Sequence, residues 1–381
     1  MSESMKENEK RVIDRFIELA SIDGESFKER PVADYLIAEF QKLGIQLCED
    51  DTAGKIGGNC GNFYGFAKGQ GKYADSEPIL FCAHMDTVAP GNNKKIILDD
   101  DGTISSDHTT VLGADDRAGI AAIIEAYTRV ITQGLDHPPI EFLFTVAEEV
   151  YGLGSAAFDY SKIRSGIAFA PDCSGEYGVY SSCEPTLISF EVQIKGKASH
   201  AGYEPEKGIN AIAAAAAAIS RLKQGWVDDH TTLNIGIIEG GSVTNAVPET
   251  CVIKGEIRSG VHDDAYRTMD LVECVFSEEA KMASAELCID KKERITVYRK
   301  DSEAVAGSAL DRYKRALEKQ KKEAVAKKSY GGSDINSLIK NGIDGLNIYG
   351  AMHNIHTTEE YTTAQEIVSV TELIMILMTQ P

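Results

Sequence analysis

The sequence lacks several features that would define common classes of protein. No apolar run approaches the roughly 18–20 residues that a membrane-spanning helix needs. H-E-x-x-H and G-x-S-x-G are both absent, which excludes zincin metalloproteases and serine hydrolases of the nucleophile-elbow type. Basic residues are few, since 39 Lys and Arg against 59 Asp and Glu give a formal net charge of −20. Such a surface repels nucleic acid and anionic lipid, so we expect neither as a partner.

Signals for secretion and for disulfide bonding are also missing. Residues 1–11 are polar and charged, without the apolar segment of a signal peptide. The eight cysteines are scattered along the chain and form no C-x-x-C pair. In a chain of this size that pattern is typical of reduced thiols. We therefore expect a cytoplasmic protein.

Strand-like and helix-like segments alternate in the first part of the chain. The apolar runs typical of buried strands lie at 79–83, 140–146 and 166–170, and the predicted helices lie at 10–20, after Pro31 and at 118–130. Strands that alternate with helices indicate parallel β-α-β units. A chain of 381 residues is long enough for two domains. We predict that the first of them is an α/β domain with a mixed, mostly parallel sheet.

The pattern changes at about Pro185 and changes back near residue 299. The predicted segments between these points are strands at 187–194, 231–239, 249–258 and 286–298, and helices at 208–223 and 263–285. Their order, β-α-β-β-α-β, matches a ferredoxin-like α+β fold. After it we predict a helix from about 305 to Lys328, a strand at 345–349 and a final helix. We therefore expect residues 1–185 and 299–381 to form the α/β domain, interrupted by an inserted domain at 186–298.

Acids and histidines follow the predicted strands and precede one predicted helix. They are His84, Asp86, Asp115, Asp116, Glu148, Glu149, Asp172, His353 and His356. In an open α/β sheet these segments meet at the carboxyl edge of the strands, where such folds bind ligands. Several acids in one cleft would repel one another unless cations were present. Imidazole and carboxylate together suit zinc, so the pattern predicts a site for two divalent ions.

Several short motifs resemble those of the dinuclear-zinc exopeptidase family. They are residues 84–88 (His-Met-Asp-Thr-Val), 112–119 (Leu-Gly-Ala-Asp-Asp-Arg-Ala-Gly) and 147–150 (Ala-Glu-Glu-Val). Residues 195–202 and 208–211 resemble the signature of that family's lid and dimerisation domain. Residues 331–334 (Gly-Gly-Ser-Asp) and the Asn354-x-His356-x-x-x-Glu360 pattern are most similar to the peptidase T, or tripeptide aminopeptidase, branch. The resemblance covers nearly the whole chain.

The resemblance implies two metal ions, most readily zinc, with cobalt or manganese as alternatives. His84 and Asp172 would hold one ion, Glu149 and His356 the other, and Asp115 would bridge both. The family pattern selects Asp115, Glu149 and His356 as ligands. It does not select their near neighbours Asp116, Glu148 and His353. Of these, Glu148 would act as general base on a water that bridges the metals, and would then pass the proton to the leaving amine. Asp86 would orient the His84 imidazole.

Further residues would bind the substrate, and all of these roles are implied by the resemblance. Arg258 would bind a substrate carboxylate as a bidentate fork, and Asn245 would hold the same end of the substrate. His200 would donate a hydrogen bond to the developing oxyanion, from the same chain or across a homodimer. Backbone at Gly332 would approach the substrate closely.

The implied reaction is metal-dependent hydrolysis of short peptides, with release of the N-terminal residue of tripeptides or dipeptides. Deacylation of N-acyl amino acids and carboxypeptidase action are alternatives, because members with the same metal ligands perform each of them. A binding protein without metals is a further alternative, but the complete set of ligands argues against it. The remaining histidines, His108, His137, His230 and His262, match no ligand position, and we expect Trp226 to serve packing.

A dinucleotide-binding fingerprint is the main rival interpretation. Gly152-x-Gly154-x-x-Ala157 follows a predicted strand, and Asp172 lies where a ribose-binding acid would be expected. Four residues, 148–151, separate that strand from the first glycine, whereas the fingerprint begins its turn at once. Two of them are glutamates, which would face the pyrophosphate with the wrong charge. We therefore regard an NAD-dependent oxidoreductase as the less favoured function.

Overall fold

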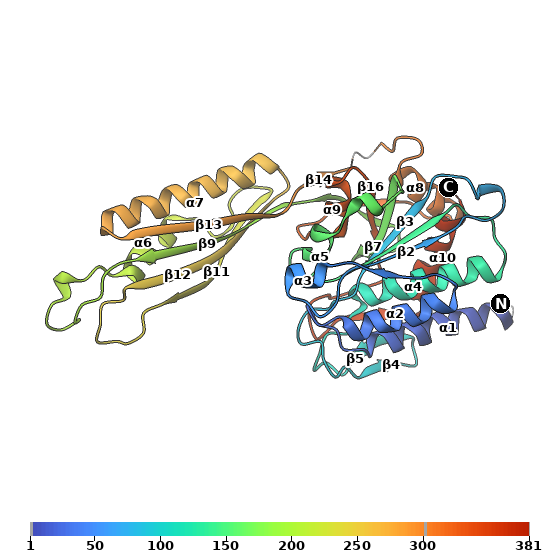
Figure 1. The fold of residues 1–381 in the computed structure, drawn as a ribbon, viewed down its shortest axis with the longest axis horizontal. Helices are drawn as coiled ribbons and strands as arrows, with labels where there is room; N and C mark the ends of the chain where they lie inside the picture. Colours follow the sequence, from blue (N-terminus) through green and yellow to red (C-terminus); the bar gives the residue numbers. More distant parts are fainter. Residues whose placement is uncertain (1–2, 301–302, 381) are drawn as a thin grey trace. The chain divides into compact units, whose positions relative to one another are not determined.

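The computed structural model describes residues 3–300 and 303–380, and these residues form two compact units. Unit 1 contains the described residues up to Ser182, those from Lys300 to Lys328 and those from Gly332 onward. Unit 2 contains Cys183–Arg299 and Ser329–Gly331. Figure 1 labels the helices and strands of both units.

A mixed sheet dominates the first unit. Its strands are β1 (Cys48–Glu49), β2 (Phe63–Ala67), β3 (Ile79–His84), β6 (Ile140–Thr145), β7 (Ile167–Cys173), β8 (Val179–Glu184), β14 (Tyr298–Arg299), β15 (Val325–Lys328) and β16 (Asp344–Tyr349). The order is β1-β2-β6-β3-β7-β16-β8-β14, and β15 pairs with β8. The central strands β6, β3, β7 and β16 run parallel, and β3 and β6 are buried at every residue. This confirms the prediction of an α/β fold with a mostly parallel sheet.

The helices of unit 1 flank this sheet (Figure 1). They are α1 (Glu3–Ala20), α2 (Arg30–Lys42), α3 (Thr52–Ile56), α4 (Ala114–Thr132), α5 (Leu153–Ala157), α8 (Ala309–Lys319), α9 (Asp334–Lys340) and α10 (Ala364–Thr379), with short 3-10 turns η1 (Gly71–Tyr73) and η2 (Tyr160–Lys162). Helix α4 is buried along most of its length and packs against α1, α10, β3 and β7. A helix that is buried on nearly all sides belongs to the centre of a core.

One predicted helix was too long. The expected helix from about 305 to 328 ends at Lys319, and Lys321 has a positive φ of 57°. Residues 325–328 instead form strand β15 at the side of β8. The left-handed conformation of Lys321 stops the helix, and pairing with β8 decides the conformation of the residues that follow.

A small antiparallel sheet, which the sequence did not predict, links two parts of unit 1. Its strands are β4 (Ile96–Leu98), β5 (Thr103–Ser106) and β17 (Tyr361–Thr363). Strand β5 pairs with both β4 and β17. Since β5 leads towards α4 and β17 follows the loop after β16, the pairing brings two predicted ligand segments together.

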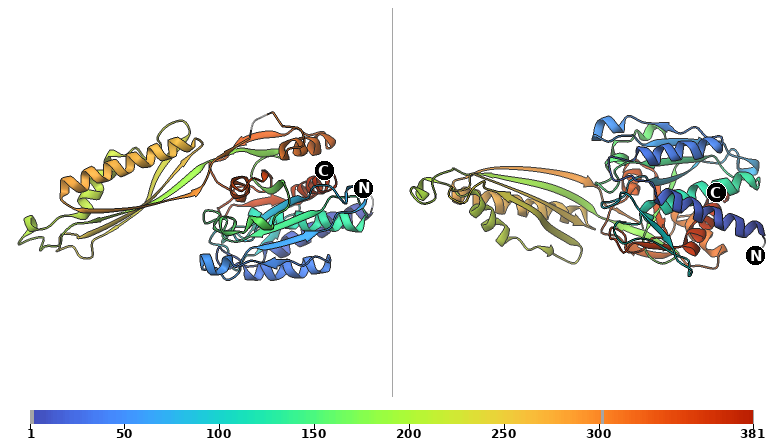
Figure 2. Two further views of the ribbon diagram at one scale, coloured as in Figure 1. Left: turned by 45° about the horizontal axis from the view of Figure 1, so that its top comes forward. Right: turned by 90° about the horizontal axis from the view of Figure 1, so that it is seen from below.

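Unit 2 is a separate antiparallel sheet with two helices. Its elements are β9 (Thr186–Lys195), η3 (Pro205–Lys207), α6 (Ala211–Arg221), β10 (Gly225–Trp226), β11 (Thr231–Gly240), β12 (Thr250–Ser259), α7 (His262–Ala283) and β13 (Glu286–Ile295). The order β10-β11-β12-β9-β13 confirms the ferredoxin-like prediction. Both helices cover one face of the sheet, as Figure 2 shows, and bury Ile188, Phe190, Val192 and Ile194 of β9.

Within the described residues, no helix combines the length and the apolar character that crossing a bilayer requires. The eight cysteines all lie in this described part of the chain, and no disulfide joins any two of them.

Candidate metal centre and active site

The five predicted metal ligands come from five separate segments of unit 1. His84 ends β3, Asp115 lies in the first turn of α4, Glu149 follows β6, Asp172 lies near the end of β7 and His356 follows β16. Because β3, β6, β7 and β16 run parallel, these segments leave the sheet at the same edge.

Contacts between these side chains form one continuous cluster. Nε2 of His84 lies 2.8 Å from Oδ1 of Asp115 and 3.8 Å from Oδ1 of Asp172. Nε2 of His356 lies 3.2 Å from Oδ2 of Asp115 and 2.9 Å from Oε2 of Glu149. Asp115 therefore presents one carboxylate oxygen to each imidazole, which is the arrangement that a bridging ligand requires.

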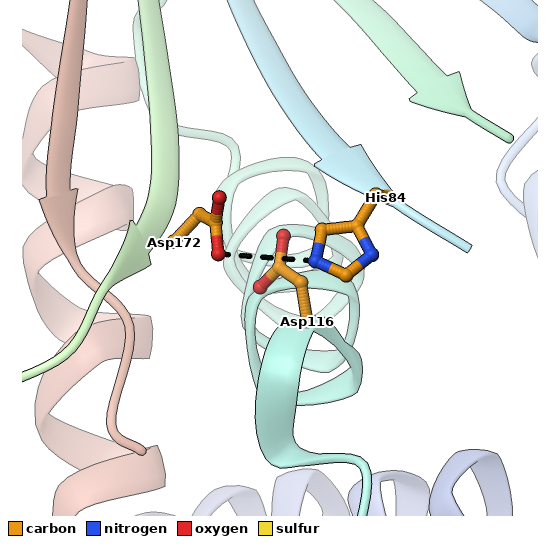
Figure 3. Close-up of side chains that lie close together, drawn as sticks. All are labelled: His84, Asp116 and Asp172. Atoms are coloured by element: carbon orange, nitrogen blue, oxygen red, sulfur yellow. Dashed lines mark ion pairs between the residues drawn. The ribbon is translucent and has the colours of Figure 1, made fainter. Parts of the chain in front are cut away.

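Asp116 also reaches this cluster, although the family pattern does not select it. One ligand atom from each of His84, Asp116 and Asp172 lies within 4.8 Å of the other two, and the same holds for His84, Asp115 and Glu149. Figure 3 shows the first of these groups, with Asp116 rising from the start of α4 towards the other two side chains. Oδ1 of Asp116 accepts a hydrogen bond from the Gly119 amide at 3.2 Å. Asp116 therefore has a structural role at the start of α4 as well as a place beside the cluster.

The surrounding carboxylates raise the pKa values of both imidazoles, His84 and His356. Hydrogen bonds with Asp115 and Glu149 raise the pKa of His356 to about 10. Burial alone would lower the pKa of His84, but hydrogen bonds with Asp115 and Asp86 outweigh it and raise this pKa well above its ordinary value. A cation placed among these carboxylates would take over the role of the protons.

The acids of the cluster are perturbed in opposite directions. Burial raises the pKa values of Asp172 and Glu149, and the neighbouring Asp115 carboxylate raises them further. Burial also raises the pKa of Glu148, with a further contribution from Glu149. Burial opposes ionisation of Asp115 as well, but hydrogen bonds from His356 and His84 hold the pKa of Asp115 well below its usual range. The Asp115 carboxylate is thus ionised, while the neighbouring carboxylates lack enough positive charge nearby to stabilise their ionised forms.

The side chains fit divalent metal ions. Oε1 of Glu149 and Oδ2 of Asp116 are buried without a hydrogen-bond partner within the described chain. A buried carboxylate oxygen without a partner carries a large desolvation cost, which a cation would remove. Imidazole and carboxylate are the ligands that zinc and related ions prefer. The observations support a metal centre built on these residues.

The Asp86 carboxylate organises the segment that carries Glu148 and Glu149. It is fully buried and accepts hydrogen bonds from the amides of Glu148 at 3.0 Å and Glu149 at 3.2 Å, and from Oγ of Ser26 at 2.7 Å. Its Oδ1 lies 3.4 Å from Nδ1 of His84, which lies closer, at 3.0 Å, to the main-chain oxygen of Asp86. Asp86 therefore contacts both the imidazole and the backbone of the two glutamates.

Glu360 connects the loop of His356 to the start of α4. Its buried carboxylate accepts hydrogen bonds from the amides of Gly113 at 2.7 Å and Asp115 at 3.1 Å. Gly113 has a φ of +80°, a conformation that glycine adopts without strain. The backbone of Asp115, the central residue of the cluster, is thus fixed by a residue four positions after His356.

His200 and Asn245 lie together in unit 2. The amides of Gly202 and Tyr203 both donate to Nδ1 of His200, at 3.1 and 3.2 Å, and the Ala201 amide donates to the Asn245 carbonyl at 3.0 Å. Because Nδ1 accepts these bonds, the proton of the neutral imidazole resides on Nε2. Both residues are exposed.

Arg258 lies at the other end of the same sheet. It pairs in register with Leu187 at the start of β9, whereas His200 follows the end of that strand. Arg258 lies eight positions along β12 from Thr250, the partner of Lys195, which corresponds to about 26 Å along an extended strand. Gly332, in unit 1, is half-buried and directly precedes Ser333, which caps α9. Arg258 and His200 of one chain are therefore too far apart to contact the same small substrate.

The histidines outside the cluster have other partners. Nε2 of His353 lies 2.7 Å from Oε1 of Glu366, and its ring stacks on Tyr361. In unit 2, His230 lies 2.5 Å from Asp264, whose carboxylate also pairs with Arg267. His353 therefore has a structural partner of its own, while His356 contacts the cluster.

Two buried partners of the site were missed at the sequence level. Glu29 accepts a hydrogen bond from the Ala147 amide at 3.0 Å, and burial, with the nearby Asp86 carboxylate, raises its pKa to about 7. Ser26 donates to Asp86. Both act across about 60 to 120 positions of sequence on groups that no motif connects to them.

The glycines of the rival dinucleotide fingerprint serve packing. Gly152 precedes α5, a helix of only five residues. A Cβ atom on Gly154 would lie 2.0 Å from the Val146 carbonyl and 2.7 Å from Oδ1 of Asn62. Gly154 therefore allows close contact between α5 and the end of β6.

Two sequence families match parts of the chain. Residues 184–283 match the peptidase dimerisation domain, and residues 64–172 match peptidase family M28. Over 372 residues the chain is 35% identical to the uncharacterized protein YqjE of Bacillus subtilis (strain 168), covering 97% of this chain and 98% of that protein.

Solved structures extend the similarity over the whole fold. The chain superimposes on aminopeptidase PepT from Bacillus cereus with a TM-score of 0.85 and 33% sequence identity, covering 97% of this chain and 98% of the other. A tripeptidase from Staphylococcus aureus gives a TM-score of 0.89 and 29% identity, with the same coverage of 97% and 98%.

Proposed function

Because the chain belongs to the dinuclear metallo-exopeptidase family, in its peptidase T-like branch, we propose that it releases the N-terminal residue of tripeptides or dipeptides. The observation that carries this proposal is the position of Asp115, which presents one oxygen to each of two imidazoles. Unit 1 would be the catalytic domain and unit 2 its lid.

Two divalent ions, most readily zinc, would occupy the cluster. His84 and Asp172 would hold one ion, Glu149 and His356 the other, and Asp115 would bridge both. When bound, the ions supply Lewis acidity towards the peptide carbonyl and towards the attacking water. The donor atoms and the buried, unpaired oxygen of Glu149 support this assignment.

Glu148 would act as the general base. Asp86 accepts a hydrogen bond from the Glu148 amide and so fixes the backbone that carries this side chain, next to Glu149. The carboxylate would accept a proton from the attacking water and would then donate it to the nitrogen of the departing peptide. Burial raises the pKa of Glu148, which brings it towards the range that both proton transfers require.

Unit 2 would complete the site in a homodimer. Arg258 would bind the substrate carboxylate, while Nε2 of His200 would donate to the oxyanion, with Asn245 beside it and Gly332 lining the site. Since Arg258 lies about 26 Å along the sheet from the end of β9 that leads to His200, the two residues of one chain would serve different active sites. This separation supports a contribution of His200 to the active site of the partner chain.

Beyond Leu233, where its pairing with β10 stops, β11 forms the edge of the sheet and offers the dimer contact. Ile237 and Ile238 on this strand are 47% and 50% exposed, and Val243 beyond it is 58% exposed. The opposite edge, β13, carries Lys291 and Lys292, and such charged edges resist pairing. We therefore propose antiparallel pairing of β11 with the same strand of a second chain.

A cytoplasmic location fits the free thiols and the acidic surface. No disulfide joins any of the eight cysteines, all of which lie within the described residues, as expected in a reducing compartment. The net charge of −20 argues against nucleic acid and anionic lipid as partners.

The test is hydrolysis of defined peptides by protein loaded with zinc, cobalt or manganese. We expect release of the N-terminal residue from unblocked tripeptides and dipeptides, and no cleavage when the N-terminus is acetylated. Release of the C-terminal residue, or preference for N-acyl amino acids, would replace the proposal with a carboxypeptidase or deacylase. Absence of hydrolysis with every metal and substrate would overturn it altogether.

A further inference from the structure

An aromatic pair lies on the surface of unit 2. The rings of Trp226 and Tyr330 meet edge to face, with centroids 4.8 Å apart and an interplanar angle of 84°. Trp226 is 49% exposed and Tyr330 is 37% exposed, and Trp226 is the single tryptophan of the chain. Trp226 therefore packs against Tyr330, as expected, but it does so at the surface and not in a buried core. Strand β10 is only two residues long and forms the edge of its sheet, so much of the ring remains uncovered.

Arg258 shares a face of the sheet with this pair. Trp226 pairs in register with Thr232, and Thr232 pairs in register with Arg258. Residues paired in this way point to the same side, and two strand spacings put the Trp226 and Arg258 backbones about 10 Å apart. The preceding residue, Ile257, belongs to the core under the helices. Alternation along β12 therefore directs Arg258 to the face that α6 and α7 leave open.

Tyr330 also fixes the guanidinium of Arg258. Its carbonyl accepts a hydrogen bond from Nη1 of Arg258 at 2.9 Å, and Nε of Arg258 donates to Oε1 of Glu256 at 2.8 Å. A guanidinium has five N–H donors, so three remain for a ligand. A fixed, partly exposed guanidinium is suited to a carboxylate, which it binds through two parallel hydrogen bonds.

We propose that Trp226, Tyr330 and Arg258 form the subsite for the C-terminal residue of the substrate, and that this subsite selects a large apolar side chain. The inference rests on the proposed function, because it assigns the substrate carboxylate to Arg258. The α-carboxylate pairs with the guanidinium, and the neighbouring side chain covers the exposed aromatic rings. Glu256, which lies beside Arg258, disfavours an acidic side chain at this position.

A purely structural role gives different expectations. If the aromatic pair only fastened residues 329–331 to the sheet, its removal would lower stability or affect all peptides equally. If it forms a subsite, its removal affects only peptides with a large apolar C-terminal residue. The comparison of two peptides with one variant therefore separates the two roles.

The experiment compares kcat/KM for Ala-Ala-Leu and Ala-Ala-Gly with the full-length, zinc-loaded protein. We expect wild type to prefer Ala-Ala-Leu by about 10-fold, the discrimination that a modest apolar contact provides. Trp226→Ala is expected to abolish this preference by lowering the value for Ala-Ala-Leu alone, whereas Trp226→Phe retains it. Leu271→Ala, which removes a 54% exposed apolar side chain from α7, is the matched control and keeps the preference. Equal loss for both peptides, or an unchanged preference in Trp226→Ala, would overturn the subsite.

Fluorescence of the single tryptophan separates failure of the subsite from failure of the proposed function. If wild type hydrolyses neither peptide, the proposed function fails, but the emission of Trp226 still reports binding. A saturable change with Ala-Ala-Leu, absent with its C-terminal amide, would support the subsite on its own. An emission spectrum unaffected by millimolar Ala-Ala-Leu would overturn the subsite whether or not hydrolysis occurs.

Discussion

Replacement of Asp86 by asparagine tests how Glu148, the proposed general base, is positioned. In the wild-type protein Oδ1 accepts from the Glu148 amide, and Oδ2 accepts from the Glu149 amide and from Ser26. Asparagine keeps the first acceptor, and its NH2 group can donate to the Ser26 hydroxyl once that hydroxyl rotates. The Glu149 amide then loses its partner. A buried N–H without a partner costs about 1–3 kcal/mol, and the same loss is expected in the free energy of unfolding.

The consequence for catalysis follows from the position of Glu148. When the segment of Glu148 shifts, its carboxylate no longer meets the attacking water correctly, and a displacement of about 1 Å costs on the order of 100-fold in rate. His84 keeps the main-chain oxygen of residue 86 as a partner for Nδ1, so its imidazole remains oriented. We therefore expect kcat to fall while both metal ions remain bound at saturating metal.

The assay combines three measurements on Asp86→Asn. Urea unfolding gives the change in stability, mass spectrometry gives the metal content, and hydrolysis of a tripeptide at saturating metal gives kcat. Ser26→Ala is the matched control, because it removes one hydrogen bond from Asp86 but leaves both glutamate amides held, so kcat should change little. A wild-type kcat in Asp86→Asn would refute the reasoning. Loss of metal, with kcat restored by excess zinc, would indicate that Asp86 acts only by orienting the His84 imidazole.

Three further predictions concern the metal centre. Glu148→Ala should keep both ions and lower kcat by several orders of magnitude, and near-normal turnover would refute its role as base. His356→Ala should lower the metal content per chain, whereas retention of both ions would direct attention to His353. Because the pKa of His356 is raised to about 10, its imidazole is protonated at neutral pH before the metal binds, and binding must release that proton. Below pH 10, the apparent metal affinity should therefore rise by about tenfold per pH unit for each proton that is released. Calorimetry in buffers of different ionisation enthalpy should detect the released protons. A metal affinity that does not change with pH would contradict this account.

The parts of the fold with strong local signals were predictable. The buried runs of β3 and β6 and the apolar helix α4 read clearly from the sequence because each is buried along its length. Acids and histidines at the ends of parallel strands are expected to meet, since the topology gathers those ends at one edge. The same argument predicted that His84 and Asp172 lie close together. It did not predict which of Asp115 and Asp116 is the metal ligand, and only the family resemblance selects Asp115.

The remaining features depend on contacts between distant segments. Strands β4, β5 and β17 have only three or four residues each, too few for a period-2 pattern to emerge. Strand β15 is decided by pairing with β8. Ser26 and Glu29 act through hydrogen bonds to Asp86 and to the Ala147 amide, which lie 60 and 118 positions away, and such contacts leave no trace in local sequence. The exposure of Trp226 follows from its place on a short edge strand, which only the sheet order reveals.

The count of metal ions per chain tests the central claim most directly. Protein purified without chelator and analysed by mass spectrometry should contain two divalent ions per chain, and removal of both should abolish peptide hydrolysis until zinc, cobalt or manganese is returned. Asp115→Ala should lose both ions, because its carboxylate contacts both imidazoles. Full hydrolytic activity in protein that holds no metal would contradict the account.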